Sequence, residues 1–155
     1  PGGTLDTATE RLAAGVGGVN NGTAGTTGAW VWARRVTTAA SGTTTINDSE
    51  SGGLFANTGT TGTTTFTLPA AAAGLHYCFT EAGDAAGELL INVQTGDAII
   101  GKTDGGATGL GISTAASTGI KNTAATNVKG DHTCLTAVDA TSWLMTSVAG
   151  VWASQ

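Results

Sequence analysis

Charged residues are scarce in this sequence. Only 11% of the 155 residues are charged, and the six Lys and Arg leave a net charge of −5. A nucleic-acid surface needs a basic stripe that neutralises phosphates, so we expect no nucleic-acid partner. Long apolar runs are missing as well: none reaches the roughly 18 residues of a membrane span, and we expect no membrane insertion.

Long-chain helix formers are equally rare, with a single Met and few Glu, Lys, Arg or Gln. Thr, Gly and Ala instead fill over half of the chain. Thr favours strands because it is β-branched, whereas Gly and Asn favour turns. A hydrophobic content of 40% argues against disorder. The composition predicts an all-β fold of short antiparallel strands, either a β-sandwich or a jelly roll.

Two parts are expected, an N-terminal arm of residues 1–28 and a β-sandwich domain of residues 29–155. The arm contains TLDTATERLAAGV, in which T-A-T-E fits a capping box and predicts a short helix. Leu5 and Leu12 would share one face of that helix. This apolar face is too small to fold alone, so both leucines are candidate contacts with another subunit.

Strand signals recur about every ten residues from residue 29 onward. Two segments, HYCFTEAGDAAGELLINV and HTCLTAVDATSWLMTSV, resemble each other. Each has His-x-Cys-x-Thr, then Asp-Ala at a turn, then an apolar return strand. We therefore expect two equivalent β-hairpins within one sandwich.

Residues 96–103, GDAIIGKT, match the phosphate-loop pattern G-x-x-x-x-G-K-[ST]. That motif needs a helix directly after its glycine-rich turn. Here the loop would contain Ile99 and Ile100, which favour extended backbone. The downstream segment DGGATGLG is too rich in glycine to be the helix. We interpret DAIIGK as a strand, and we expect neither a nucleotide site nor any other cofactor.

The only histidines and cysteines form two pairs, His76 with Cys78 and His132 with Cys134. The spacing i, i+2 places both members of a pair on one face of a strand. The cysteines could form a disulfide across the sandwich or remain buried free thiols. If the strands lie close together, the four side chains could bind zinc. Zinc is the least favoured of the three, because ordinary zinc sites use C-x₂₋₄-C loops.

Catalytic patterns are weak. Asp131, His132 and Ser142 could be written as a triad, but there is no G-x-S-x-G elbow. Asp131 and His132 are also adjacent, and would point to opposite faces of a strand. Glu81 and Glu88 flank the first predicted hairpin and would face each other as paired acids only by accident. We expect no catalytic residues and no enzyme activity.

The segments TFTLPAAAAGLHYCF, LLINVQTGDAIIG, NTAATNVKGDHTCL and SWLMTSVAGVWAS, within residues 60–154, carry a resemblance. They resemble structural motifs of tailed-bacteriophage virion proteins, namely capsid decoration (cement) proteins and modules of tail fibres. The resemblance implies a β-sandwich or jelly roll that forms a homo-oligomer, a trimer, and sits on a shell or fibre. Such sequences usually carry non-ligands where the two His and two Cys stand, so the resemblance gives zinc no support.

Four tryptophans are the largest side chains available for either subunit contact or core filling: Trp30, Trp32, Trp143 and Trp152. Together with the resemblance, they lead us to expect a structural virion protein on the capsid surface, bound to the major capsid protein. Two alternatives remain. One is a tail-fibre or spike module that binds carbohydrate, and the other is a subunit of an extracellular filament completed by a donated N-terminal segment.

Overall fold

The computed structural model describes residues 9–13, 16–19, 34–83, 87–102, 111–113 and 119–155. The chain divides into two units, Pro1–Ala33 and Arg34–Gln155, so the division falls a few residues beyond the boundary predicted after residue 28.

In the N-terminal unit, β1 (Thr9–Ala13) and β2 (Val16–Val19) pair as antiparallel strands. The sequence predicts part of a helix at Thr9–Ala13, and the structure has a strand there instead. A helix this short is marginal without tertiary contacts, so a capping signal alone does not determine it.

The described secondary structure of the C-terminal unit is strand, apart from one short 3₁₀ helix, η1 (Asp48–Glu50). The strands are β3 (Val36–Ala39), β4 (Gly42–Thr45), β5 (Leu54–Asn57), β6 (Gly62–Thr67), β7 (His76–Glu81), β8 (Gly87–Asn92), β9 (Ala98–Lys102), β10 (Gly111–Ser113), β11 (Gly119–Asn122), β12 (His132–Ala137), β13 (Ser142–Ala149) and β14 (Trp152–Ser154). The all-β class predicted from composition is confirmed. No helix in the described ranges has the length and apolar character needed to cross a membrane.

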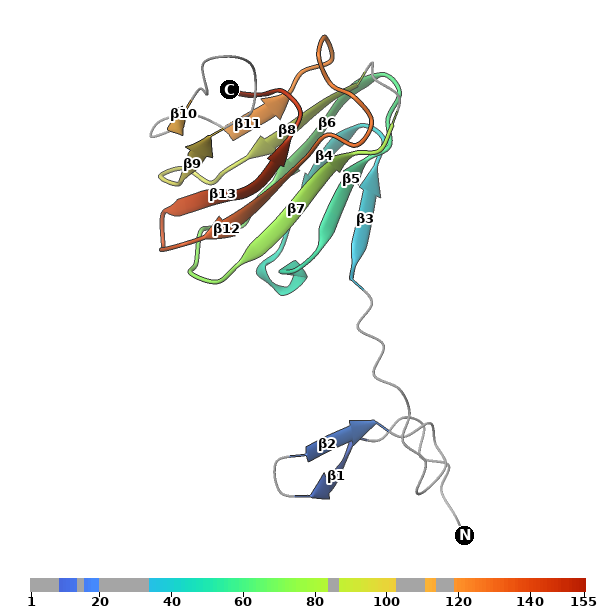
Figure 1. Cartoon of the computed structure of the whole chain (residues 1–155), viewed down its shortest axis with the longest axis vertical. Helices are drawn as coiled ribbons and strands as arrows, with labels where there is room; N and C mark the ends of the chain where they lie inside the picture. The colour runs from blue at the N-terminus through green and yellow to red at the C-terminus, as the bar shows by residue number, and fades with distance from the viewer. Residues whose placement is uncertain (1–8, 14–15, 20–33, 84–86, 103–110, 114–118) are drawn as a thin grey trace. The chain divides into compact units, whose positions relative to one another are not determined.

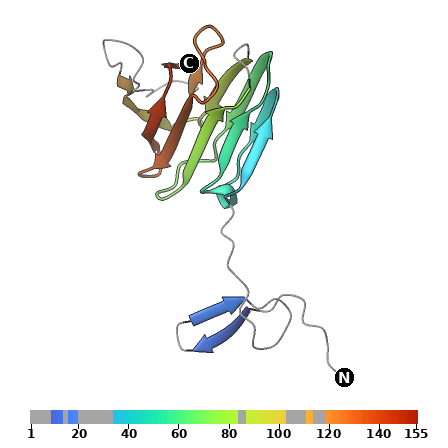
Figure 2. The same ribbon diagram turned by 45° about the vertical axis from the view of Figure 1, so that its right-hand side comes forward.

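These strands form two sheets (Figures 1 and 2). The seven-stranded sheet has the order β10-β9-β13-β12-β7-β5-β3, and the five-stranded sheet has the order β14-β11-β8-β6-β4. From β3 to β9 the chain alternates between the sheets, so each strand returns to its own sheet parallel to the strand before it. Parallel pairs join β3 to β5, β5 to β7, β4 to β6 and β6 to β8.

The later strands follow a different rule. β12 and β13 form an antiparallel hairpin that lies between β7 and β9, with β12 antiparallel to β7 and β13 parallel to β9. Both sheets are therefore mixed. The expectation of antiparallel strands throughout is wrong, because alternation between two sheets makes successive strands of one sheet run the same way.

The corners at which the chain crosses between the sheets are hydrogen-bonded to neighbouring strands. Ala82 N donates to Asn57 O at 2.8 Å, so the corner that follows β7 is bonded to the end of β5. The corner that follows β5 is bonded to β3 in the same way. A Cβ on Gly83 would lie 2.2 Å from Gly59 O, so this close approach requires glycine.

Only the second of the two predicted hairpins exists. β12 and β13 pair with each other, whereas β7 and β8 lie in different sheets. The local sequence signals are alike. The chain after β7, however, is hydrogen-bonded to the end of β5 and continues into the facing sheet. A turn signal thus specifies that the chain reverses, and not which sheet receives the next strand.

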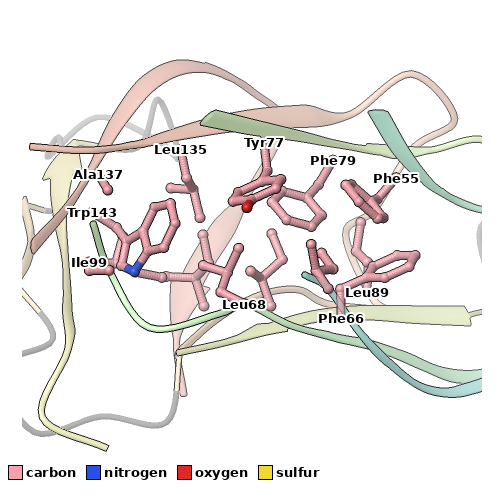
Figure 3. Close-up of a cluster of buried hydrophobic side chains, with 14 of the residues drawn as sticks. Phe55, Phe66, Leu68, Tyr77, Phe79, Leu89, Ile99, Leu135, Ala137 and Trp143 are labelled. Atoms are coloured by element: carbon pink, nitrogen blue, oxygen red, sulfur yellow. The ribbon is translucent and has the colours of Figure 1, made fainter. Parts of the chain in front are cut away.

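Both sheets contribute to one core cluster. Figure 3 shows Phe55, Tyr77 and Phe79 of the seven-stranded sheet pointing toward Phe66 and Leu89 of the other. The ring centroids of Phe55 and Phe66 are 5.5 Å apart, in an edge-to-face arrangement that aromatic pairs favour.

The tryptophans that the structure describes belong to this core. Trp143 is 0% exposed and Trp152 is 2% exposed. Neither can reach a partner subunit without unfolding, so both fill the core rather than serving as interface residues. Leu5, Trp30, Trp32 and the side chain of Leu12 lie outside the described part of the structure.

Candidate functional site

Cys78 and Cys134 are direct partners on β7 and β12, and their sulfurs are bonded. Of the three alternatives left open by the sequence, the disulfide is present. It joins two neighbouring strands of one sheet and does not cross from one sheet to the other. The alternation along both strands places this bond on the side away from the core, because Tyr77 and Leu135 point inward.

His76 lies beside the disulfide. Its Nε2 is 3.4 Å from Cys78 Sγ, and its Nδ1 is 2.8 Å from Thr136 Oγ1. Arg34 Nη2 donates to Cys78 Sγ at 3.0 Å. Burial lowers the pKa of His76, and the positive charge of Arg34 lowers it further.

The four candidate zinc ligands do not assemble as a set. The donor atoms of His76, Cys78 and Cys134 lie within 4.8 Å of one another, whereas His132 is not in that group. His132 instead has Nδ1 3.1 Å from Gly130 O and Nε2 3.4 Å from Ser147 Oγ. Zinc binds thiolate sulfur, and bonded sulfurs provide none.

The outward side chains of the seven-stranded sheet form what we call the outer face. On the central strands they are Leu54, Ala56, His76, Cys78, Thr80, His132, Cys134, Thr136 and Leu144, with Val36 and Ile100 toward the edges. None of these residues is a carboxylate. Ala56 and Cys78 are each only 5% exposed. Leu144 and Ile100 are direct partners on β13 and β9, and each is 37% exposed.

The catalytic patterns written from the sequence are not assembled. His132 is the partner of Ala149 at one end of β13, whereas Ser142 begins β13 at the other end. Glu88 forms an ion pair with Lys121 at 3.5 Å, while Glu81 is buried.

The strand predicted in the phosphate-loop segment is present. Ala98–Lys102 is β9, parallel to β13 and antiparallel to β10. Residues 103–110, where the helix of a phosphate loop would follow, lie outside the described part of the structure.

A second candidate site is buried at the end of the sheets where β7 ends and β12 begins. Its members are polar and lie at most 8% exposed: Asn57, Thr64, Glu81, Asn122, Asn127 and Asp131. We call this set the polar layer. It occupies positions that continue the inward-facing rows of the apolar core.

One row of the polar layer belongs to the seven-stranded sheet. Asn57 and Glu81 are partners on β5 and β7. Glu81 N donates to Asp131 O at 2.8 Å, which places Asp131 on the other side of Glu81. Glu81 therefore lies in the middle of a row of three inward-facing polar side chains.

The facing row belongs to the five-stranded sheet, where Leu89 lies between its partners Asn122 and Thr64. Hydrogen bonds join the ends of the two rows. Asn122 Nδ2 donates to Asp131 Oδ2 at 2.9 Å, and Thr64 Oγ1 donates to Asn57 Oδ1 at 2.7 Å. Glu81, the middle residue of the first row, consequently faces Leu89, the middle residue of the second row.

Asn127, in the loop between β11 and β12, covers the open end of this arrangement. Its Nδ2 donates to Gly87 O. A Cβ on Gly87 would lie 3.4 Å from Asn57 Nδ2, and that nitrogen donates to Glu81 Oε2 at 2.9 Å. Gly87 thus lies between the Asn127 side chain and the Asn57–Glu81 pair, and Val128 N, next to Asn127, donates to Asp131 Oδ2 at 3.0 Å.

Burial is the largest influence on Glu81, and it raises the pKa of that carboxyl. Hydrogen bonds from Asn57 and from the backbone of Gly83 oppose the rise, and the nearby charge of Asp131 adds to it. Two carboxyls therefore share a buried end of the fold.

Sequence patterns place Glu81 and Asp131 only in catalytic arrangements and do not identify the three asparagines. A signal was present. Glu81 stands two residues after the core residue Phe79, and Asn57 and Asn122 follow buried apolar residues at the same spacing. A polar residue at an inward position of a strand end is the pattern to look for.

Comparison of this chain with protein-family models, with curated proteins and with solved structures finds no match. The function must therefore be argued from the residues themselves. The two features described above are the outer face, which contains no carboxylate, and the polar layer, which contains buried oxygen atoms.

Proposed function

We propose that the chain is a structural virion protein, a capsid decoration (cement) protein that stabilises a phage shell through trimeric contacts. The major capsid protein would be its partner, and the capsid surface its location. The sequence resemblance supports this proposal, and so does one structural observation: the outer face contains no carboxylate in a chain whose net charge is −5.

A face without carboxylates suits a surface that another protein covers. Covering a carboxylate removes its water, which is unfavourable unless a partner charge compensates, and interface centres are accordingly poor in charge. Leu144 and Ile100 provide adjacent exposed apolar side chains on this face, and Val36 is 56% exposed at its edge. The Cys78–Cys134 bond joins the central strands, so the surface is rigid before binding and loses little entropy on binding.

We also propose that the two sheets form a β-sandwich. In support, one core cluster draws on both sheets, and the chain crosses between them at successive corners. If this decoration protein binds the assembled shell and not the free capsid subunits, its binding free energy stabilises the assembled state by mass action.

A substitution on the outer face tests the proposal. Leu144→Glu in the full chain would introduce a carboxylate beside Ile100, and we expect loss of trimers in light scattering and loss of co-sedimentation with shells that lack the protein. Thr43→Glu is the matched control, because Thr43 is exposed on β4 of the other sheet. If Leu144→Glu binds shells as the unsubstituted protein does, the outer face is not the interface.

Two other measurements distinguish the alternatives. Saturable binding of the full chain to a glycan array would favour a tail-fibre or spike carbohydrate-binding module, whose expected loop GKTDGGATGLG lies largely outside the described residues. Fibres of the purified protein in electron microscopy would favour the filament subunit. Imaging the source particle would show directly whether the protein covers a shell.

A further inference from the structure

Four buried side-chain oxygens of the described residues have no hydrogen-bond partner. Asn92 Oδ1 lies at the end of β8, outside the polar layer, and the other three belong to the layer: Glu81 Oε1, Asn122 Oδ1 and Asn127 Oδ1. All three are acceptors. Buried polar atoms almost always have a partner, so each exception needs an explanation. Three exceptions of one kind within one cluster call for a single explanation, a species that interacts with several oxygens at once.

Rotation of the amides does not remove these exceptions. Asn122 Nδ2 donates to Asp131 Oδ2 at 2.9 Å and to Val151 O at 3.0 Å. Asn127 Nδ2 donates to Gly87 O. Reversing either amide would place its oxygen against another acceptor, so the nitrogen positions are settled by their partners.

Neither a proton nor one water molecule satisfies all three oxygens. A proton on Glu81 Oε1 would supply a single donor, sufficient for one amide oxygen. A water molecule alone has two hydrogens and would leave one oxygen without a donor, so protonation of Glu81 and a bound water would both be needed. A cation can interact with all three oxygens together.

We propose that the polar layer binds a calcium ion, with Glu81 Oε1, Asn122 Oδ1 and Asn127 Oδ1 as ligands. Ca²⁺ binds carboxylate and amide oxygens in flexible geometry, whereas Mg²⁺ demands a near-ideal octahedron and keeps several waters. Zinc is disfavoured by the ligand type, since no nitrogen or sulfur ligand belongs to the layer.

The charge of the layer also matches a divalent cation. Glu81 and Asp131 supply two carboxyl groups, and Asp131 is held by Asn122 and by Val128 N at 3.0 Å. Within the described ranges, the ion pairs use Glu50 and Glu88 instead, so no described basic side chain neutralises the layer. The ion would connect β7, β11 and the loop before β12, and would thereby stabilise the folded state.

Thermal unfolding of the full chain with its disulfide intact tests the proposal. We expect the Tm in millimolar CaCl₂ to exceed that in EGTA by roughly 4 °C or more. MgCl₂ should have a smaller effect. An identical Tm in CaCl₂ and EGTA would overturn the proposal and would leave protonation of Glu81 or bound water as the explanation.

Glu81→Gln makes the test specific. The added amide group can donate to the neighbouring oxygens, so this variant should fold at least as well as the unsubstituted protein in EGTA and should not respond to calcium. Glu50→Gln is the matched control, because Glu50 is a buried carboxylate with partners outside the layer. A calcium response that survives in Glu81→Gln would overturn the assignment of the ligands.

Terbium luminescence provides a second readout that does not depend on stability. Trp152 is the strand partner of Asn122, so excitation of tryptophan should sensitise Tb³⁺ bound in the polar layer. We expect calcium to displace this emission and Glu81→Gln to abolish it. Emission that Glu81→Gln leaves unchanged would mean binding at an adventitious surface site only, and would contradict the proposal.

Discussion

Reduction of the Cys78–Cys134 disulfide offers a quantitative test of how this fold is stabilised. The bond joins residues 56 positions apart. In the chain-entropy description, a cross-link over a loop of that length stabilises the folded state by about 4 kcal/mol, because it restricts the unfolded chain. Neither cysteine belongs to the core cluster, so reduction removes no contact within that cluster.

The shift in Tm follows from the size of the C-terminal unit. With an unfolding entropy of about 2 cal/mol/K per residue over residues 34–155, a loss of about 4 kcal/mol corresponds to roughly 15 °C. Calorimetry of the same protein with and without a phosphine reductant measures this directly, since no side chain is replaced. Urea unfolding should also show a larger m-value after reduction, because the unfolded chain expands.

The control is the double variant Cys78→Ala, Cys134→Ala, which should unfold near the Tm of the reduced protein and should not respond to reductant. Mass spectrometry should first show that the oxidised protein is lighter than the reduced one by two hydrogen atoms. A Tm that changes by less than about 3 °C on reduction would refute the reasoning, because it would mean that the unfolded chain gains little freedom when the loop opens.

Three further predictions concern single side chains. Trp143→Ala should destabilise the protein by about 3–5 kcal/mol in urea unfolding because Trp143 is fully buried, whereas Leu144→Ala next to it should cost much less; equal losses would contradict the assignment of their faces. Tyr77 is the only tyrosine, and its pKa is raised to about 12, mainly by burial and also by the charges of Asp48 and Glu50. Tyrosinate absorbance in the folded protein should therefore titrate near that pH and not near 10.0. The pKa of His76 lies below its ordinary value of 6.5, so the unfolded state takes up the proton first; stability should fall as the pH drops below 6.5, and His76→Gln should remove that part of the slope.

The all-β class was predictable from composition, and the strands around Phe66, Phe79 and Leu135 from their alternation. Topology was not. The two His-x-Cys segments carry equal local signals, yet one leads into a hairpin and the other into the facing sheet. The difference arises from tertiary contacts, in which Ala82 and Gly83 rest on the preceding corner. Such contacts join residues distant in sequence, and no local pattern records them.

For the candidate sites the outcome was similar. The spacing of His76, Cys78, His132 and Cys134 indicated which side chains share a face, but the choice among disulfide, thiols and zinc depended on strand pairing. The polar layer went unrecognised because its asparagines resemble turn residues when each is considered alone. Asn57 and Asn122 share an inward position at a strand end, and this becomes visible only when the rows of two sheets are placed opposite each other.

The alternation of β3 to β8 between the sheets has a consequence for how the protein is made. From β5 to β8 each strand pairs with the strand two places earlier, so this half can assemble in order as the chain leaves the ribosome. β12 and β13, which separate β9 from β7, are synthesised later, and the seven-stranded sheet stays in two pieces until they are made. Cys78 can therefore form its disulfide only after Cys134 has been synthesised, so oxidation follows the synthesis of β12.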